Sequence, residues 1–189
     1  MRIIGGKLKG SALCMAKDKT TRPLKDMARE SLFNLLAHSN KIPLRIELSN
    51  VLDLYAGTGS FGLECLSRQA SCVYFVENGK SAFEILNKNI NKLKIKKKTK
   101  VFFNDVFALI EKQNFLSTKF DLIFCDPPFK DTNIKKLIEL IFYKNLLKKN
   151  GIIILHRNKK NEEKLPGYFV LLDERIYGLS KITFGKLLS

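Results

Sequence analysis

The sequence is poor in the residues that mark secreted, membrane-spanning and metal-binding proteins. It has no tryptophan, two histidines and four cysteines, and the cysteines form neither a CxxC pair nor another spacing typical of zinc sites. No apolar run approaches the ~20 residues that a transmembrane helix needs, and residues 1–6 are too polar for the apolar core of a signal peptide. We therefore expect a cytoplasmic protein with reduced cysteines, no bound metal and no membrane partner.

Acidic residues are also scarce. The 18 Asp and Glu residues face 34 Lys and Arg residues, which gives a formal net charge of +16 at pH 7. A chain this basic attracts polyanions, so nucleic acid is the first partner to consider. A genome-wide bias toward lysine would raise the charge as well, so the charge supports a nucleic-acid substrate without establishing one.

The apolar pattern predicts one α/β domain of ordinary composition, with 45% apolar residues in 189. Short apolar runs alternate with segments of helical periodicity, and two strand-like stretches flank Gly178. This alternation predicts a mostly parallel sheet with helices on both faces and an antiparallel edge. We expect strands at 51–55, 72–76, 101–103, 120–125 and 151–156, with helices at 60–68, 80–93, 106–112 and 133–147.

The first 45 residues have a different pattern. Residues 1–20 are rich in Gly and Lys and predict a small hairpin or arm, and Arg22-Pro23 then opens a helix expected over 24–38. We therefore divide the chain into an N-terminal extension, residues 1–45, on the substrate side, and a catalytic domain, residues 46–189.

A glycine loop, Gly57-Thr58-Gly59-Ser60-Phe61-Gly62, follows the first strand of the main domain, and Glu77 follows Gly57 by twenty residues. The same pattern is typical of NAD-binding proteins, so it is weak evidence by itself. Asp53 distinguishes an S-adenosylmethionine site from an NAD site. A carboxylate at this turn would repel the pyrophosphate of NAD and attract the sulfonium and amino groups of S-adenosylmethionine. Asp53 could instead bond the loop's own amides, but we favour the methyl donor.

Two further acids follow strands at the same edge of the sheet. Glu77 ends the second expected strand and is placed to accept hydrogen bonds from ribose hydroxyls. Asp105 follows the third and could hold the adenine amino group, although an N-cap of the helix starting at Val106 is an equal expectation.

The strongest signal is the turn Asp126-Pro127-Pro128-Phe129, which leaves an apolar strand at its carboxyl end, where α/β sheets bind ligands. The amino nitrogen of a nucleobase is a poor nucleophile, because its lone pair is delocalised into the ring. Two acceptors, the Asp126 side chain and the Pro127 carbonyl, could hold its hydrogens and aim the lone pair at a methyl group, while Phe129 stacks on the base. The two histidines form no triad, and we expect His156 to be a hydrogen-bonded structural residue.

With these motifs the chain resembles the RsmD-type methyltransferases, which methylate the 2-amino group of one guanine in small-subunit ribosomal RNA. The resemblance runs nearly end to end. It includes Arg2-Ile3-Ile4-Gly5-Gly6, Arg29-Glu30-Ser31-Leu32-Phe33-Asn34 after Arg22-Pro23, the block from Asp53 to Arg68, the Asp-Pro-Pro-Phe turn, and Glu174-Arg175 with Gly178. It implies a Rossmann-like class I methyltransferase with a seven-stranded sheet, a small N-terminal hairpin-plus-helix extension, and RNA of the small ribosomal subunit as substrate.

We therefore expect an S-adenosylmethionine-dependent rRNA (guanine-N2-)-methyltransferase acting on 16S ribosomal RNA, as a monomer. The catalytic residues would be Asp126, Pro127 and Phe129; the donor would be bound by Asp53, Tyr55, Gly57, Thr58, Gly59, Glu77, Asn78, Asp105 and Val106; and the substrate by Arg22, Arg29 and Pro128, with Lys7, Lys9 and Lys25 as further candidates for phosphate contacts. Three alternatives stay open from the residues: an adenine or cytosine amino methyltransferase on RNA or DNA, an NAD-dependent oxidoreductase, and a non-catalytic RNA-binding assembly factor.

Overall fold

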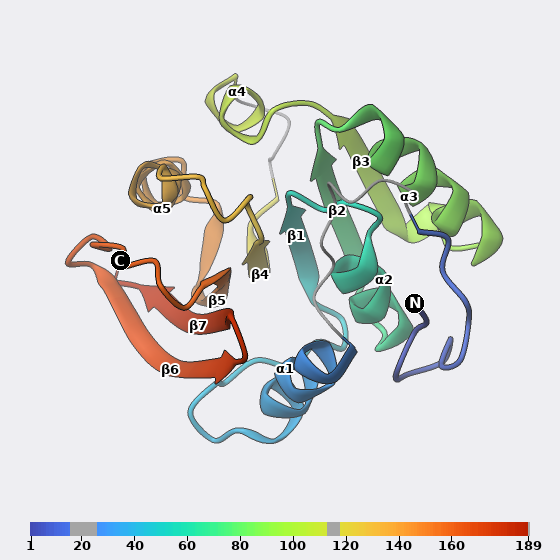
Figure 1. Ribbon diagram of the computed structural model, residues 1–189, viewed down its shortest axis with the longest axis horizontal. Helices are drawn as coiled ribbons and strands as arrows, with labels where there is room; N and C mark the ends of the chain where they lie inside the picture. The colour runs from blue at the N-terminus through green and yellow to red at the C-terminus, as the bar shows by residue number, and fades with distance from the viewer. Residues whose placement is uncertain (16–25, 113–117, 189) are drawn as a thin grey trace.

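Seven strands form one mixed sheet in the order β3-β2-β1-β4-β5-β7-β6, with helices on both faces (Figure 1). The computed structural model describes residues 1–15, 26–112 and 118–188. The strands are β1 (Asn50–Leu54), β2 (Cys72–Glu77), β3 (Thr99–Phe103), β4 (Phe120–Cys125), β5 (Leu147–Asn158), β6 (Phe169–Tyr177) and β7 (Ser180–Leu187). The helices are α1 (Asp26–His38), α2 (Ser60–Ser67), α3 (Lys80–Lys92), the 3-10 turn η1 (Lys96–Lys98), α4 (Val106–Glu111) and α5 (Ile134–Tyr143). The expected seven-stranded, mostly parallel sheet is confirmed, as is its antiparallel edge, where β7 pairs with both β5 and β6.

Successive strand residues point to opposite faces of the sheet, so apolar strands supply two cores. Val51, Phe75 and Phe124 pack with α1, α2 and α3 in one cluster. Leu52 and Ile123 pack with α4 and α5 in the other. Figure 1 shows the same division of the helices. Because both faces are covered, the carboxyl edge of the parallel strands is where polar residues of adjacent strands can reach a ligand.

The helix expected over 133–147 ends earlier, at Tyr143. Asn145 has a φ of 51°, and the amide of Leu146 donates to the carbonyl of Ile141 at 3.1 Å while that of Asn145 donates to Phe142 at 2.9 Å. This pair of bonds is a Schellman motif, in which Asn takes the left-handed position that stops a helix. The residues after it start β5, which is longer than the strand expected over 151–156.

Within its described residues, the N-terminal extension has one isolated antiparallel bridge, Arg2 to Ala12, where a small hairpin or arm was expected. Its residues dock on α2: Glu64, which is completely buried, accepts the amides of Ile4 and Gly5, each at 2.8 Å. Ile3 and Leu13 belong to the same core cluster as the sheet. The domain boundary near residue 45 stays a prediction, and the two parts share one core.

Candidate active site

The glycine loop joins β1 to α2 through a backbone that only certain residues tolerate. Tyr55, Gly57 and Gly59 have φ values of 61°, 56° and 87°. A positive φ at a bulky residue such as Tyr55 is uncommon and concentrates at functional sites. A Cβ atom at Gly59 would lie 2.4 Å from the side chain of Leu86, whereas one at Gly57 would meet nothing within 4 Å. Gly59 is thus needed for packing, and Gly57 opens onto free space that a ligand can occupy.

Glu77, at the end of β2, holds this loop in place. Its Oε2 accepts the amide of Gly57 at 2.6 Å and its Oε1 accepts the amide of Gly79 at 2.7 Å. The residue is 9% exposed. Each carboxylate oxygen has a second acceptor position, so Glu77 can support the loop and still accept from a ligand's hydroxyls.

Asp53 lies beneath the loop on β1 and is 1% exposed. Its Oδ2 accepts the amide of Gly62 at 3.0 Å, which is the loop-bonding role that we considered less favoured. Burial raises the pKa of Asp53 well above its usual range, the Gly62 hydrogen bond lowers it, and the charges of Asp126 and Glu77 raise it further. A cationic ligand near this group would favour the ionised form. The structure places Asp53 within the loop's framework, and its role toward a donor stays a prediction.

The other expected donor residues surround the loop at the same edge. Asp105 is exposed and caps α4, accepting the amide of Ala108 at 3.0 Å through Oδ1. Asn78 is exposed, whereas Thr58 and Val106 are buried. The N-cap expectation for Asp105 is therefore confirmed, and its second oxygen carries no hydrogen bond to the described residues.

The Asp-Pro-Pro-Phe turn lies directly beside the glycine loop. β1 and β4 are parallel neighbours, and the amide of Asp126 donates to the carbonyl of Leu54 at 3.4 Å. Here the chain order of the strands reverses, which is where open α/β sheets bind their ligands. The Asp126 side chain is 22% exposed, Pro127 is buried, Pro128 is exposed and Phe129 is half-buried. The two motifs that carry the sequence prediction are thus brought together.

Hydrogen bonds from the end of β5 fix this turn. The completely buried guanidinium of Arg157 donates to the carbonyls of Pro128, at 3.0 Å, and Asp131. Asn161 donates to the carbonyl of Phe129 at 2.9 Å. Within the described part of the chain, the Pro127 carbonyl accepts no hydrogen bond, so the second acceptor that we expect for the substrate amine is available.

His156 and Arg157 contact the Asp-Pro-Pro-Phe turn, although neither was among the predicted site residues. His156 Nδ1 lies 2.7 Å from Asp126 Oδ1, so the hydrogen-bonded role is confirmed, but its partner is the predicted catalytic carboxylate. The pairing register of β4 and β5 indicates this contact. Cys125 pairs with Leu155, so the next residue of each chain segment, Asp126 or His156, lies at the same edge of the sheet.

The basic residues expected to contact phosphate have different environments. Arg29 is completely buried and donates to the carbonyl of Arg2 at 2.7 Å. This corrects the expectation of a surface phosphate contact, because the guanidinium ties α1 to the N-terminal segment. Lys7 and Lys9 are exposed. Arg22 and Lys25 lie outside the described residues.

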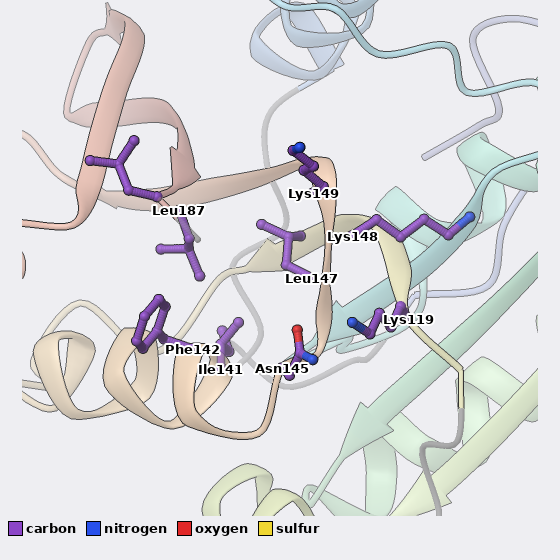
Figure 2. A pocket seen from close by; sticks show the side chains of 9 residues that line it. Lys119, Ile141, Phe142, Asn145, Leu147, Lys148, Lys149 and Leu187 are labelled. Carbon is purple, nitrogen blue, oxygen red and sulfur yellow. The ribbon is translucent and has the colours of Figure 1, made fainter.

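A cavity lies at the end of the sheet opposite the glycine loop and the Asp-Pro-Pro-Phe turn (Figure 2). Its volume is about 490 Å³, and its lining includes Lys119, Phe142, Leu147 and Leu187. Lys119 precedes β4, Leu147 begins β5 and Leu187 ends β7, so this cavity lies at the amino ends of the parallel strands. None of the predicted site residues lines it.

The described residues contain neither a candidate metal cluster nor a candidate membrane span. Among residues 1–15, 26–112 and 118–188 no group of three His, Cys, Asp or Glu side chains could hold a metal ion. Within the same residues no helix is both long and apolar enough to span a membrane.

The fold and the site define a Rossmann-like, S-adenosylmethionine-dependent methyltransferase. Its features here are the strand order, the glycine loop after β1, the acid that ends β2 and the Asp-Pro-Pro-Phe turn after β4. A family model described as Conserved hypothetical protein 95 matches residues 1–186. The chain therefore belongs to this family, which is the RsmD family.

Curated and solved relatives agree with this assignment. Ribosomal RNA small subunit methyltransferase D of Haemophilus influenzae is 35% identical over 179 residues, covering 95% of this chain and 90% of that protein. The protein of the same name from Escherichia coli is 31% identical, covering 94% and 85%. The solved structure of yhhF from Escherichia coli superposes with a TM-score of 0.84 at 28% identity, covering 99% of this chain and 97% of the other. These matches extend over the N-terminal extension as well as the sheet.

Proposed function

We propose that the protein transfers a methyl group from S-adenosylmethionine to the exocyclic 2-amino group of a guanine in 16S ribosomal RNA of the small subunit. The observation that carries this proposal is the position of Asp126, with a partly exposed carboxylate, against the β1 end that opens the glycine loop. The near end-to-end match to proteins named ribosomal RNA small subunit methyltransferase D supports the choice of substrate.

The residues at the glycine loop suit the donor. The free space at Gly57 lets the backbone approach it closely, Glu77 can accept from its ribose hydroxyls, and the free oxygen of Asp105 can accept from its adenine amino group. When bound, S-adenosylmethionine supplies a methyl carbon on a positively charged sulfur. Buried Asp53 would stabilise that positive charge across the loop.

The Asp-Pro-Pro-Phe turn would hold the base. Asp126 and the Pro127 carbonyl accept the two amine hydrogens, which turns the nitrogen lone pair toward the methyl carbon, and Phe129 stacks on the ring. The new N–C bond forms as the C–S bond breaks, and the nitrogen then loses one proton, to Asp126 or to water. No strong base is required, since the nitrogen has become cationic. Most of the acceleration would come from proximity and orientation.

The RNA would approach along the same edge of the sheet. Exposed Lys159 and Lys160, directly after the carboxyl end of β5, are candidates for phosphate contacts there. Exposed Lys7 and Lys9 lie beside the end of α2, and they would contact phosphates farther from the turn. Pro128, exposed on the turn, is placed to touch the substrate. We take the protein to act as a monomer on a largely assembled small subunit.

The test is transfer of tritium from labelled S-adenosylmethionine to small ribosomal subunits that lack the modification, followed by nucleoside analysis. Label in 2-methylguanosine is the expected result. Label in a methylated adenosine or cytidine would support methyl transfer to a nucleobase amine but refute guanine as the target base. Tight RNA binding without label in any ribosomal particle would indicate a non-catalytic assembly factor.

A further inference from the structure

His156 lies beside the proposed catalytic carboxylate in a setting that leaves its imidazole little freedom. It belongs to β5 and is 3% exposed, and its register partner on β7 is Ile182. Its Nδ1 is 2.7 Å from Asp126 Oδ1. The ring also meets Phe129 edge to face, with centroids 5.5 Å apart and planes at 76°. The His156 side chain therefore contacts both Asp126 and Phe129, the two residues that would bind the base.

The surroundings of the two ring nitrogens indicate which one carries the hydrogen. An ionised carboxylate only accepts hydrogen bonds, so an Nδ1 bonded to it must donate. Nε2 is buried and has no hydrogen-bond partner among the described residues. A hydrogen on Nε2, in the other tautomer or in the imidazolium, would find no acceptor there. The arrangement fits a neutral imidazole with its hydrogen on Nδ1.

This hydrogen bond divides the work of the two Asp126 oxygens. Oδ1 is bound to His156, and Oδ2 has no hydrogen bond to any residue that the structure describes. Fixing Oδ1 stops the carboxylate from rotating about its Cβ–Cγ bond. Oδ2 is then the oxygen left for the substrate amine, on a side chain that is 22% exposed.

We propose that His156 is a positioning residue for methyl transfer, which donates from Nδ1 to Asp126 Oδ1 so that Oδ2 is the atom that receives the amine, and whose ring supports Phe129 against the base. This inference rests on the proposed function. It separates His156 from its neighbour Arg157, which donates to the backbone carbonyls of Pro128 and Asp131 and to the side chain of Glu163.

Kinetics of three variants test the positioning role. His156→Leu removes the donor, whereas His156→Asn keeps a nitrogen donor two bonds from Cβ, as Nδ1 is. Thr183→Val is the matched control, because it removes a hydrogen bond from a buried residue of the adjacent strand, to Glu174 at 3.1 Å, without touching the turn. All rates are taken per folded molecule, from thermal unfolding of each preparation.

We expect His156→Leu to lower kcat by about 10- to 100-fold, the effect of a misaligned reacting group, with donor affinity within twofold of the parent. His156→Asn should recover most of that loss, and Thr183→Val should keep the parent kcat. In an Asp126→Ala background, His156→Leu should cause no further loss, because the two residues act as a unit. A parent-like kcat in His156→Leu, or equal losses in the Leu and Asn variants, would overturn the proposal.

A spectroscopic test does not depend on turnover. The chain has two histidines, and exposed His38 serves as the internal reference. In ¹⁵N-labelled full-length protein, we expect His156 to give a single neutral tautomer with the hydrogen on Nδ1, which Asp126→Ala converts to a tautomer mixture while His38 is unchanged. A hydrogen on Nε2, or no response to Asp126→Ala, would refute the hydrogen-bond arrangement. The expected spectrum without methylation of any ribosomal particle would instead refute the proposed function, and the positioning role of His156 with it.

Discussion

Replacing Glu77 with Gln would test two roles of this residue, which are holding the glycine loop and binding the donor. Both oxygens of Glu77 accept backbone amides, from Gly57 at 2.6 Å and from Gly79 at 2.7 Å. A glutamine has one oxygen and one NH₂ group, so whichever way it turns, an N–H faces another N–H. The variant must therefore lose one of the two charge-assisted bonds and weaken the other.

The size of the effect follows from those two bonds. A hydrogen bond to a charged group contributes about 1.5–3 kcal/mol, so we expect a loss of about 2–3 kcal/mol in the free energy of unfolding. At about 2–4 °C per kcal/mol for a chain of this length, Tm should fall by about 4–12 °C. Affinity for S-adenosylhomocysteine should fall by about 10- to 100-fold, since the ribose hydroxyls lose an ionised acceptor and the loop its anchor.

Thermal unfolding and calorimetric titration with S-adenosylhomocysteine measure the two quantities on the same preparation. Glu139→Gln is the control, because Glu139 is partly exposed on α5 and 3.9 Å from Lys135, a surface pair that contributes little. An unchanged Tm in Glu77→Gln would refute the account of the loop. A lower Tm with unchanged affinity would refute the ribose contact.

Three further changes have expected outcomes. Asp126→Ala should leave S-adenosylhomocysteine binding within twofold and lower turnover by at least about 100-fold, measured by tritium transfer, because it removes an acceptor that orients the amine; an equal loss of binding would contradict this role. Raising the salt concentration should weaken RNA binding with a log–log slope of roughly −4 for about five phosphate contacts, measured by filter binding; a flat response would exclude backbone contacts. Because burial raises the pKa of Asp53, its folded form binds protons more tightly than its unfolded form, so its contribution to stability is lost as the pH rises through the raised pKa. In urea titrations, Asp53→Asn should therefore lose less free energy of unfolding over that pH range than the parent protein. The same pH dependence in both proteins would refute a raised pKa for the buried Asp53 carboxyl.

The sequence predicted the parts of the fold in which local pattern and burial agree. The strand over Phe120–Cys125 is apolar throughout and ends at Asp126, and the structure has the same boundaries. β5 was predicted too short, because Lys148, Lys149 and Asn150 are exposed and carry no apolar signal. β5 includes them because Leu147 already pairs with Phe120, before a shift in the register of this ladder, and such pairing is information of longer range than the local pattern.

The site shows the same limit. The glycine loop and the Asp-Pro-Pro-Phe turn were found because each is a contiguous motif. The contact between His156 and Asp126 joins residues thirty apart in the chain, and it became visible only once the register of β4 and β5 was known. Arg29 was misassigned because a basic residue near the substrate side fits either a phosphate or a buried carbonyl, and composition does not distinguish the two.

The docking of the N-terminal segment on α2 also sets an order of events in synthesis. The amides of Ile4 and Gly5 are among the first parts of the chain to be made, yet their acceptor, Glu64, follows sixty residues after Ile4. Until the ribosome has added that residue and α2 has formed, these two amides have no native acceptor. The N-terminal segment is thus translated first, but it docks only after the helix that follows the glycine loop has been made.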